Sequence, residues 1–355
     1  MTQAHQSGNL PRDTHRSVAE SGARGRPGGL WAVNNPSGNA GLMAVDKVGS
    51  AVLFLDPSTL SVLGSASVPG AHEMVISPDH RLGYVAQFGK WGRNAAGVGA
   101  LLEAATMICV FDLQTRTVVT RIDTSPHIGP HGMRFDCDGQ LWVTFESNAL
   151  GLVDTERHVL VGAWNLGEPS QPPRTLEISD DGQKLYCSGK GDDIIVFDCA
   201  SRRVRSRIAL TGGATSLTAA PDGHRLITFD KLKQDLLVVD MHEDRIVARH
   251  PYRGALLSNP KVSRFVHARF SPDGRHLATC NYAGGTAHLH DGDNPADHGI
   301  IPVAKGPQGL AFSDDCSTLY VANHDCGILT LIDVESAKPT GWLPGGAGIE
   351  SFSFY

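Results

Sequence analysis

The 355-residue sequence predicts an all-β fold, a seven-bladed β-propeller built from four-stranded blades. Three observations support this expectation. A short turn ending in Asp recurs six times, an alternating apolar strand follows each turn, and a further apolar strand ending in Asp completes each repeat. The 40 Gly and 20 Pro residues interrupt the chain at short intervals and leave little room for long helices. Four short strands in about 40 residues are typical of a propeller blade.

The turns set the period of the repeat. Their Asp residues lie 41 to 43 residues apart in three of the five intervals, and insertions lengthen the other two intervals to 51 and 59 residues. Six complete units therefore begin near residues 72, 131, 174, 215, 266 and 308. The turn residues are Asp79, Asp138, Asp181, Asp222, Asp273 and Asp315.

The two ends of the chain supply the seventh blade. Residues 30–68 contain three strands, LWAVN, AVLFLD and SVLGSASV, and residues 348–355 contain one orphan strand, IESFSFY. We expect the C-terminal strand to become the innermost strand of the first blade, because this closes the ring and removes exposed sheet edges. The propeller then spans residues 28–355. Residues 1–27 have almost nothing apolar to bury, so we expect a disordered tail there.

Composition restricts the partners and the compartment. The net charge of −6, from 31 Lys and Arg against 37 Asp and Glu, argues against nucleic acid as a partner. No apolar run approaches the roughly 18–20 residues of a membrane span, and no apolar signal segment opens the chain. The seven Cys residues include no CxxC pair and suit free thiols in a reducing compartment. We therefore expect a cytoplasmic protein, a monomer or small homo-oligomer without a membrane partner.

One repeat carries a family resemblance. The segment LYVANHDCGILTLIDVES, residues 319–336, resembles the repeat of the YVTN/YncE-like seven-bladed propellers, a superfamily that includes lactonase-type enzymes. The resemblance covers roughly residues 29–355, and the Trp-Asp pair of WD40 repeats is absent from every unit. It implies the fold, and it leaves the function open because propellers host many activities.

The candidate site lies where loops converge. In a propeller, the loop before the innermost strand and the loop between the second and third strands open on the same face, around the central channel. Seven residues before each turn Asp stand His72, His131, Arg174, Thr215, Val266 and Gln308. One position later stand Glu73, Gly132, Thr175, Ser216, His267 and Gly309. Charged residues further along the innermost strands are Arg134, Glu177 and Arg269.

The ends of the second strands add a further polar column. Its members are Asn35, Phe88, Glu146, Lys190, Lys231, Tyr282 and His324. Histidines, carboxylates and cations around one pocket suit acid–base chemistry on an anionic small molecule. The predicted catalytic residues are His72, Glu73, His131 and His267. The predicted substrate-binding residues are Arg174, Arg269, Arg134, Glu177, Glu146, Lys190, Lys231, Tyr282, His324 and Trp91.

Several of these residues also have structural interpretations. His131 lies in a Gly-Pro-His-Gly turn. In the alternative interpretation its side chain caps backbone groups of that turn. His72 and Glu73 are neighbours, so in a regular strand they point to opposite faces and one of them is structural. Arg174 either binds substrate or braces the preceding Pro-Pro loop, and His267 is one residue out of register with the other histidines.

The remaining charges have structural alternatives too. In the alternative interpretation, Arg134, Glu177 and Arg269 form an inter-blade salt-bridge network. Lys190 and Lys231 are then solvated charges at the rim of the channel. Glu350, in the closing strand, is a further candidate for the mouth. His288 and His290 are interpreted as surface or packing residues.

Two insertions lie on the face of the mouth. Residues 88–106 lengthen one loop, and we expect a lid there, with Trp91 and Arg93 as contacts and a short helix in GALLEAAT. The alternative is that the loop covers a neighbouring blade or an oligomer contact. Residues 250–265 form the second insertion.

Three functions remain open. The first is an enzyme of lactonase, lyase or isomerase type that needs no cofactor. In it, His131 or His72 acts as acid or base, while Arg174 and Arg269 hold a substrate carboxylate. The second is a metal-dependent enzyme in which His72, His131, His267 and His324 bind a divalent ion. The third is a non-enzymatic ligand-binding or protein-interaction scaffold. No G-x-S-x-G, P-loop or dinucleotide motif is present, and a haem-binding propeller is a minor option.

Overall fold

The computed structural model describes residues 41–93, 95, 99–167, 172–189, 191–230, 232–233, 235–251, 265–296 and 298–355. The predicted tail, the LWAVN strand and most of the 250–265 insertion lie outside these residues. None of the described residues forms a helix that is long and apolar enough to cross a membrane.

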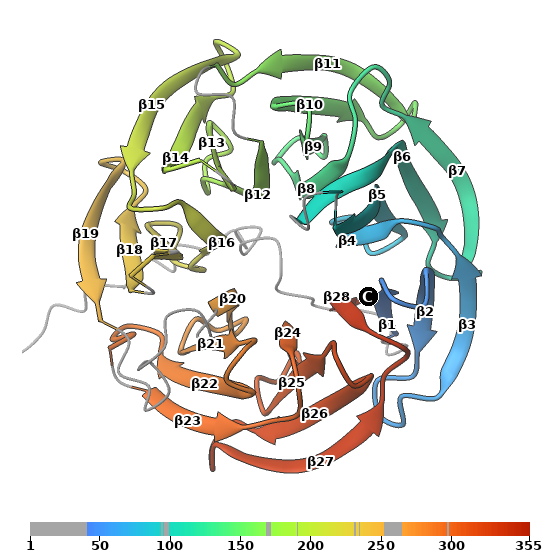
Figure 1. Ribbon diagram of the computed structural model, residues 1–355, viewed down its shortest axis with the longest axis vertical. Coiled ribbons are helices and arrows are strands. Elements are labelled where there is room, and N and C mark those ends of the chain that lie inside the picture. Colours follow the sequence, from blue (N-terminus) through green and yellow to red (C-terminus); the bar gives the residue numbers. More distant parts are fainter. Residues whose placement is uncertain are drawn as a thin grey trace, which may run out of the picture.

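The described strands form seven four-stranded antiparallel sheets around a central channel, as predicted (Figure 1). The first blade contains β28 (Ile349–Phe354), β1 (Leu42–Asp46), β2 (Ala51–Leu55) and β3 (Val62–Ser67). The second blade contains β4 (Ala71–Ile76), β5 (Leu82–Arg93), β6 (Gly99–Asp112) and β7 (Thr117–Asp123). The third contains β8 (Pro130–Phe135), β9 (Leu141–Phe145), β10 (Ala149–Asp154) and β11 (Val159–Asn165).

The other four blades repeat this order from the channel outward. The fourth contains β12 (Pro173–Ile178), β13 (Lys184–Gly189), β14 (Asp193–Asp198) and β15 (Arg203–Ala209). The fifth contains β16 (Ala214–Ala219), β17 (Arg225–Asp230), β18 (Leu236–Asp240) and β19 (Arg245–His250). The sixth contains β20 (Phe265–Phe270), β21 (His276–Asn281), β22 (Thr286–Asp291) and β23 (His298–Pro302). The seventh contains β24 (Pro307–Phe312), β25 (Thr318–Asn323), β26 (Ile328–Asp333) and β27 (Lys338–Pro344).

The ring closes as the sequence predicts, by pairing of the C-terminal strand with the first blade. Strand β28 is antiparallel to β1, with Leu42 opposite Phe354, and Gly41 and Tyr355 exchange two backbone hydrogen bonds of 2.9 Å. One expectation is wrong: the second strand of this blade is Leu42–Asp46, not residues 30–34. Both segments are short and apolar, so the sequence pattern alone did not separate them.

Burial follows the distance from the axis. The second and third strands of each blade are mostly buried, whereas the outermost strands alternate between exposed and partly buried residues, as in β7. Side chains pack between neighbouring blades; for example, the rings of Phe54 and Phe111 meet edge to face at 5.7 Å. The core therefore consists of layers between the blades, and each blade depends on its neighbours.

The innermost strand of every blade carries a β-bulge at the same level. The pairing register of each innermost strand shifts after its first residue and resumes at its third or fourth, so one or two residues leave the ladder. The residues at this break are Glu350, His72, His131, Arg174, Thr215, Val266 and Gln308. Bulges of this kind re-aim side chains next to functional sites. Because the break releases His72 and Glu73 together, the two-face rule for adjacent strand residues does not separate them.

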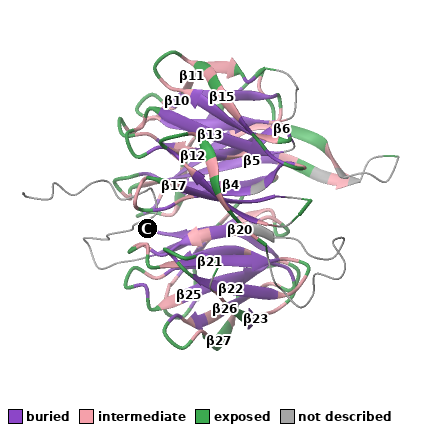
Figure 2. Cartoon of the chain, turned by 90° about the vertical axis from the view of Figure 1, so that its left-hand side faces the viewer, coloured by how far each residue is buried: buried purple, intermediate pink, exposed green. Residues whose placement is uncertain are grey.

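The insertion at residues 88–106 is a continuation of the sheet. Strands β5 and β6 pair as a long hairpin, with Gly89 opposite Ala104 and Lys90 opposite Glu103. The predicted helix in GALLEAAT is wrong, because these residues belong to β6 and their backbone groups pair with β5. Figure 2 shows the hairpin projecting beyond the ring.

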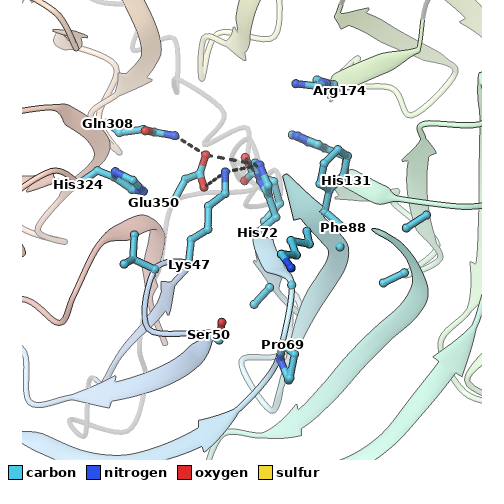
Figure 3. A pocket seen from close by; sticks show the side chains of 18 of the residues that line it. Lys47, Ser50, Pro69, His72, Phe88, His131, Arg174, Gln308, His324 and Glu350 are labelled. Atoms are coloured by element: carbon cyan, nitrogen blue, oxygen red, sulfur yellow. Dashed lines mark hydrogen bonds and ion pairs between the residues drawn. The ribbon is translucent and has the colours of Figure 1, made fainter. Parts of the chain in front are cut away.

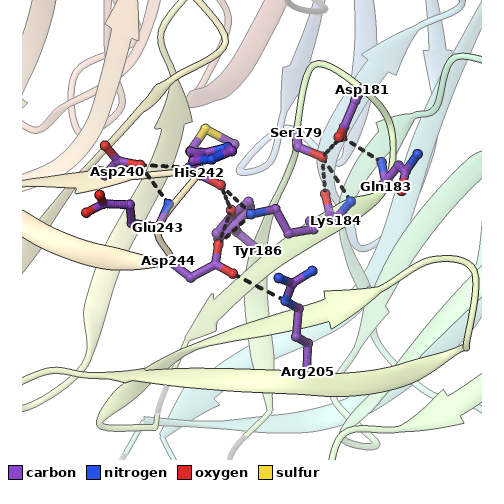
Figure 4. Close-up of polar contacts among 11 residues, drawn as sticks. Ser179, Asp181, Gln183, Lys184, Tyr186, Arg205, Asp240, His242, Glu243 and Asp244 are labelled. Atoms are coloured by element: carbon purple, nitrogen blue, oxygen red, sulfur yellow. Dashed lines mark hydrogen bonds and ion pairs between the residues drawn. The ribbon is translucent and has the colours of Figure 1, made fainter.

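Polar contacts join blades on the face opposite the mouth (Figure 4). Lys184 Nζ lies 2.7 Å from Asp244 Oδ1, and the Tyr186 hydroxyl donates to the same oxygen at 2.6 Å. Both side chains also reach the carbonyl of Met241. The turns on this face are stabilised locally, as where Ser179 Oγ donates to Asp181 Oδ1 at 2.6 Å.

Candidate functional site

The bulges and the ends of the second strands surround one cavity of about 920 Å³ at the channel mouth (Figure 3). Side chains from several blades converge there, which suits a ligand site. The lining residues from the predicted columns are His72, Glu73, Phe88, His131, Arg174, Thr175, His267, Tyr282, Gln308 and His324. Glu350 and Lys47 also line this cavity.

Two buried histidines from neighbouring blades face each other at the mouth. The ring centroids of His72 and His131 lie 4.3 Å apart, and the Phe88 ring lies 5.1 and 5.2 Å from them. Burial, reinforced by the positive charges of Lys47 and Arg174, holds the pKa of His72 well below its usual range. Burial also lowers the pKa of His131 well below that range, so both imidazoles are neutral near pH 7.

The polar atoms of this pair are not all satisfied. The Nδ1 atoms of His72 and His131 are buried and have no hydrogen-bond partner among the described residues. Buried polar atoms are nearly always paired in native proteins, so two unpaired atoms at one place indicate a missing ligand or water. The alternative reading of His131 as a cap for backbone groups is not supported by any described contact of its Nδ1 atom.

Glu73 adds a carboxyl group to the histidine pair. Its Oε1 atom lies 3.9 Å from His72 Nδ1. Burial, and next the negative charge of Glu350, raise the pKa of Glu73 to about 7. A carboxyl group with this pKa both gives and takes a proton near neutral pH.

Lys47 and Glu350 hold the other side of His72. Lys47 Nζ lies 2.7 Å from Glu350 Oε2 and 2.9 Å from His72 Nε2. Glu350 Oε1 lies 3.6 Å from His72 Nε2, and Gln308 donates to the same carboxylate oxygen. Because an ammonium group only donates, His72 accepts at Nε2 and carries its proton on Nδ1 in this arrangement.

Lys47 was missed by the sequence reasoning. The segment LMAVDKVGSAVLFLD aligns with LYVANHDCGILTLID, which places Lys47 in the column of His324. The alignment is not apparent when LWAVN, residues 30–34, is taken as the second strand of the first blade, because Lys47 then falls outside the column. Glu350, considered only as a further candidate, is in register with Gln308 once the bulges are aligned.

Arg174 is positioned by a carboxylate of the preceding blade. Its Nε and Nη2 atoms donate to Glu146 Oε1 at 2.8 and 2.6 Å. Its guanidinium carbon lies 5.4 Å from the centre of the Phe88 ring. Arg174 therefore brings positive charge to the cavity wall in a fixed orientation.

The charges further along the innermost strands form a separate layer. Arg134 donates to both carboxylate oxygens of Glu177, at 3.0 and 2.7 Å, across two blades. This contact fits the inter-blade salt-bridge alternative. Burial, followed by the charge of Arg134, lowers the pKa of Arg269 to about 10. These three residues are not among the described residues that line the mouth cavity.

The other predicted residues lie at the rim or outside it. Tyr282 donates to Asp325 at 2.5 Å, and His324 Nδ1 lies 3.1 Å from the same carboxylate oxygen. Lys190, Lys231 and the side chain of Trp91 lie outside the described part of the chain, as does the side chain of Arg93.

The histidines of the sixth blade are packing residues. His288 and His290 are buried, and His290 contacts the Thr279 hydroxyl at 3.0 Å and the Pro295 carbonyl at 2.7 Å. His288 Nε2 lies 2.9 Å from the Thr286 hydroxyl. His288 and His290 were interpreted as surface or packing residues, and their burial shows that they are packing residues.

Comparisons with known proteins identify the fold and no closer relationship. None of the protein families and none of the curated proteins searched matches the chain. The periplasmic gluconolactonase PpgL of Pseudomonas aeruginosa is similar in structure, with a TM-score of 0.70 and 18% identity, over 89% of this chain and 98% of that one. Kuenenia stuttgartiensis hydrazine synthase gives a TM-score of 0.65 and 17% identity, over 81% and 90%. The resemblance to lactonase-like propellers is confirmed at the level of the fold.

Proposed function

We propose that this protein is an enzyme that opens the lactone ring of a small, anionic organic molecule at the channel mouth. The observation that carries the proposal is the buried pair of neutral histidines, His72 and His131, facing a cavity beside Glu73. Neutral imidazoles accept protons, and a carboxyl group with a pKa of about 7 exchanges them. The structural likeness to a gluconolactonase supports lactone hydrolysis over lyase or isomerase chemistry.

The reaction is a hydrolysis. The cluster formed by His72, Glu73 and His131 takes a proton from a water molecule, whose oxygen attacks the lactone carbonyl carbon. The ring C–O bond then breaks, and the proton ends on the released alkoxide oxygen. The product is an open-chain hydroxy acid, and no redox partner is needed.

Substrate charge is matched by two cations in the cavity wall. Lys47 and Arg174 line the cavity on either side of the histidine pair (Figure 3). Each is oriented by its own carboxylate, Glu350 at 2.7 Å for Lys47 and Glu146 at 2.6 Å for Arg174. Fixed cations of this kind orient a substrate carboxylate or phosphate at small entropic cost.

Hydrolysis of a panel of five- and six-membered lactones, with and without a carboxylate substituent, tests the proposal. We expect turnover by the parent protein and a loss of about 100- to 10,000-fold in kcat/KM for His131→Ala, as is usual for a group in acid–base catalysis. His242→Ala is the matched control, because His242 is exposed in a turn on the opposite face. The proposal fails if no lactone is turned over, or if both variants behave like the parent.

A further inference from the structure

We propose that the channel mouth binds one divalent transition-metal ion, with His72, Glu73 and His131 as its three protein ligands. This inference deepens the proposed function, on which it rests for its catalytic meaning: a bound metal would lower the pKa of the attacking water and so replace direct proton transfer to these three side chains. The ligand set differs from the four-histidine set that the sequence suggested, since Glu73 replaces His267 and His324.

The geometry brings one ligand atom from each residue within reach of a single ion. Candidate donor atoms of His72, Glu73 and His131 all lie within 4.8 Å of one another, and the two histidine rings come from adjacent blades. Bonds of about 2.0–2.2 Å in a tetrahedral site place ligand atoms roughly 3.4 Å apart. A small inward movement of the side chains therefore completes the site.

The unsatisfied atoms belong to the same two histidines whose donor atoms converge with Glu73. Both histidines are more than nine-tenths buried, with exposed fractions of 7% for His72 and 5% for His131, and each has an unpartnered Nδ1 atom. The Oε1 atom of Glu73 lies 3.9 Å from Nδ1 of His72. One ion bound among these three groups satisfies both orphaned nitrogens and the carboxylate together.

Glu350 lies near the position of the outer contact that metal-binding histidines normally have, and a shift of a few tenths of an ångström would bring it within hydrogen-bond distance. It lies 3.6 Å from His72 Nε2 through Oε1, and Gln308 fixes the same carboxylate. When His72 binds metal through Nδ1, its proton moves to Nε2 and Glu350 accepts the hydrogen bond, as in carboxylate–histidine–metal arrangements. Lys47 Nζ lies 2.9 Å from His72 Nε2 and gives up that contact when Nε2 carries the proton, while its ion pair with Glu350 Oε2 remains.

The donor set indicates the class of metal. Two imidazoles and one carboxylate suit zinc and related divalent ions, whereas Mg²⁺ and Ca²⁺ prefer oxygen ligands alone. Three protein ligands leave a fourth position open for water, as in catalytic zinc sites. Phe88 packs beside both rings and keeps one side of the site apolar.

Titration of metal-free protein with Co²⁺, followed by visible absorption, tests the site without any assay of activity. We expect one equivalent to bind with the bands of a four- or five-coordinate ion. His72→Ala, His131→Ala and Glu73→Gln should each weaken binding by more than roughly 100-fold, since even outer-contact residues contribute 10- to 100-fold. Glu350→Gln should weaken binding by roughly 10-fold.

Two further variants separate this ligand set from other histidines. His324→Ala should bind Co²⁺ like the parent, and so should His242→Ala on the opposite face. Circular dichroism and the Tm of each metal-free variant show whether it is folded, and Glu73→Gln keeps the shape of the side chain. No stoichiometric Co²⁺ binding by the parent, or binding that survives in all three folded ligand variants, overturns the proposal.

The outcomes also distinguish the metal site from the proposed reaction. Full lactone hydrolysis by protein shown to be metal-free overturns the metal site and leaves the proposed function standing. One equivalent of Co²⁺ bound by these ligands without hydrolysis of any lactone supports the site and overturns the reaction.

Discussion

Two groups of buried polar side chains, one on each face of the ring, differ in how their polar atoms are satisfied. On the face away from the mouth, Lys184, Tyr186 and Asp244 satisfy one another across two blades at 2.6 to 2.7 Å (Figure 4). At the mouth, His72 and His131 are also buried but keep unpartnered nitrogens beside a cavity (Figure 3). The contacts of Lys184, Tyr186 and Asp244 stabilise the propeller, whereas the histidine pair is suited to binding a ligand.

This difference predicts which property each substitution changes. Substitutions on the opposite face should lower the free energy of unfolding and leave kcat/KM unchanged. Substitutions at the mouth should lower activity far more than the free energy of unfolding, because the Nδ1 atoms of His72 and His131 have no hydrogen bond to lose and the remaining cost is that of the space left by the rings.

Asp244→Ala should have the largest effect on stability. The substitution leaves the buried Lys184 ammonium and the Tyr186 hydroxyl without their shared carboxylate. Breaking a buried ion pair on one side typically costs about 3 kcal/mol or more. We expect a loss of that size in urea-unfolding experiments, with unchanged kcat/KM for the folded fraction. An unchanged midpoint would show that this contact does not hold the blades.

Tyr186→Phe should have a smaller effect of the same kind. It removes the hydroxyl that lies 2.6 Å from Asp244 Oδ1 and 2.7 Å from the Met241 carbonyl oxygen, and leaves the ring buried. Hydrogen bonds to charged groups contribute about 1.5–3 kcal/mol, so the loss should fall near the lower end while Lys184 still pairs with Asp244. The double variant Tyr186→Phe/Lys184→Met measures the coupling, which should be non-zero because the two groups share one partner.

Lys47→Met tests whether a cation at the channel mouth binds the negative charge of the substrate. It removes the cation 2.7 Å from the buried Glu350 carboxylate, so we also expect a loss of stability, and kcat and KM are measured on the folded protein. We expect the KM for carboxylated lactones to rise roughly tenfold, the size of one charge-assisted hydrogen bond, while the KM for neutral lactones changes less. Equal changes for both substrate sets would show that Lys47 acts through His72 and not on the substrate charge.

Arg245→Ala should have the smallest effect. Arg245 pairs with Glu243 on the opposite face, and its side chain is 61% exposed. Exposed ion pairs contribute about 0–1 kcal/mol, so both Tm and kcat/KM should match those of the parent. A larger change would mean that exposed contacts on this face also hold the blades together.

The fold could be predicted because the repeat is visible in the sequence. The turn Asp residues give the period, the orphan strand at residues 348–355 gives the closure, and pairing of β28 with β1 confirms both. The helix predicted in GALLEAAT was wrong because Ala, Leu and Glu favour helices locally. In this protein the pairing of β6 with β5 determines the structure instead.

The site could be predicted in outline only. The column seven residues before each turn Asp is the column of bulge residues, so aligning the repeats found His72, His131 and Arg174. A bulge is not visible in one sequence, so the joint orientation of His72 and Glu73 could not be foreseen. The partnership of Arg174 with Glu146 likewise depends on how two blades pack, which the repeat pattern does not specify.

The most direct test of the central claim is the kcat/KM of the double variant His72→Ala/His131→Ala on a carboxylated lactone turned over by the parent. Groups that act as one unit are not additive, so the double variant should lose no more activity than His131→Ala alone, with circular dichroism showing that both variants are folded. Retention of the parent's kcat/KM by the folded double variant would contradict the assignment of the active site to the channel mouth.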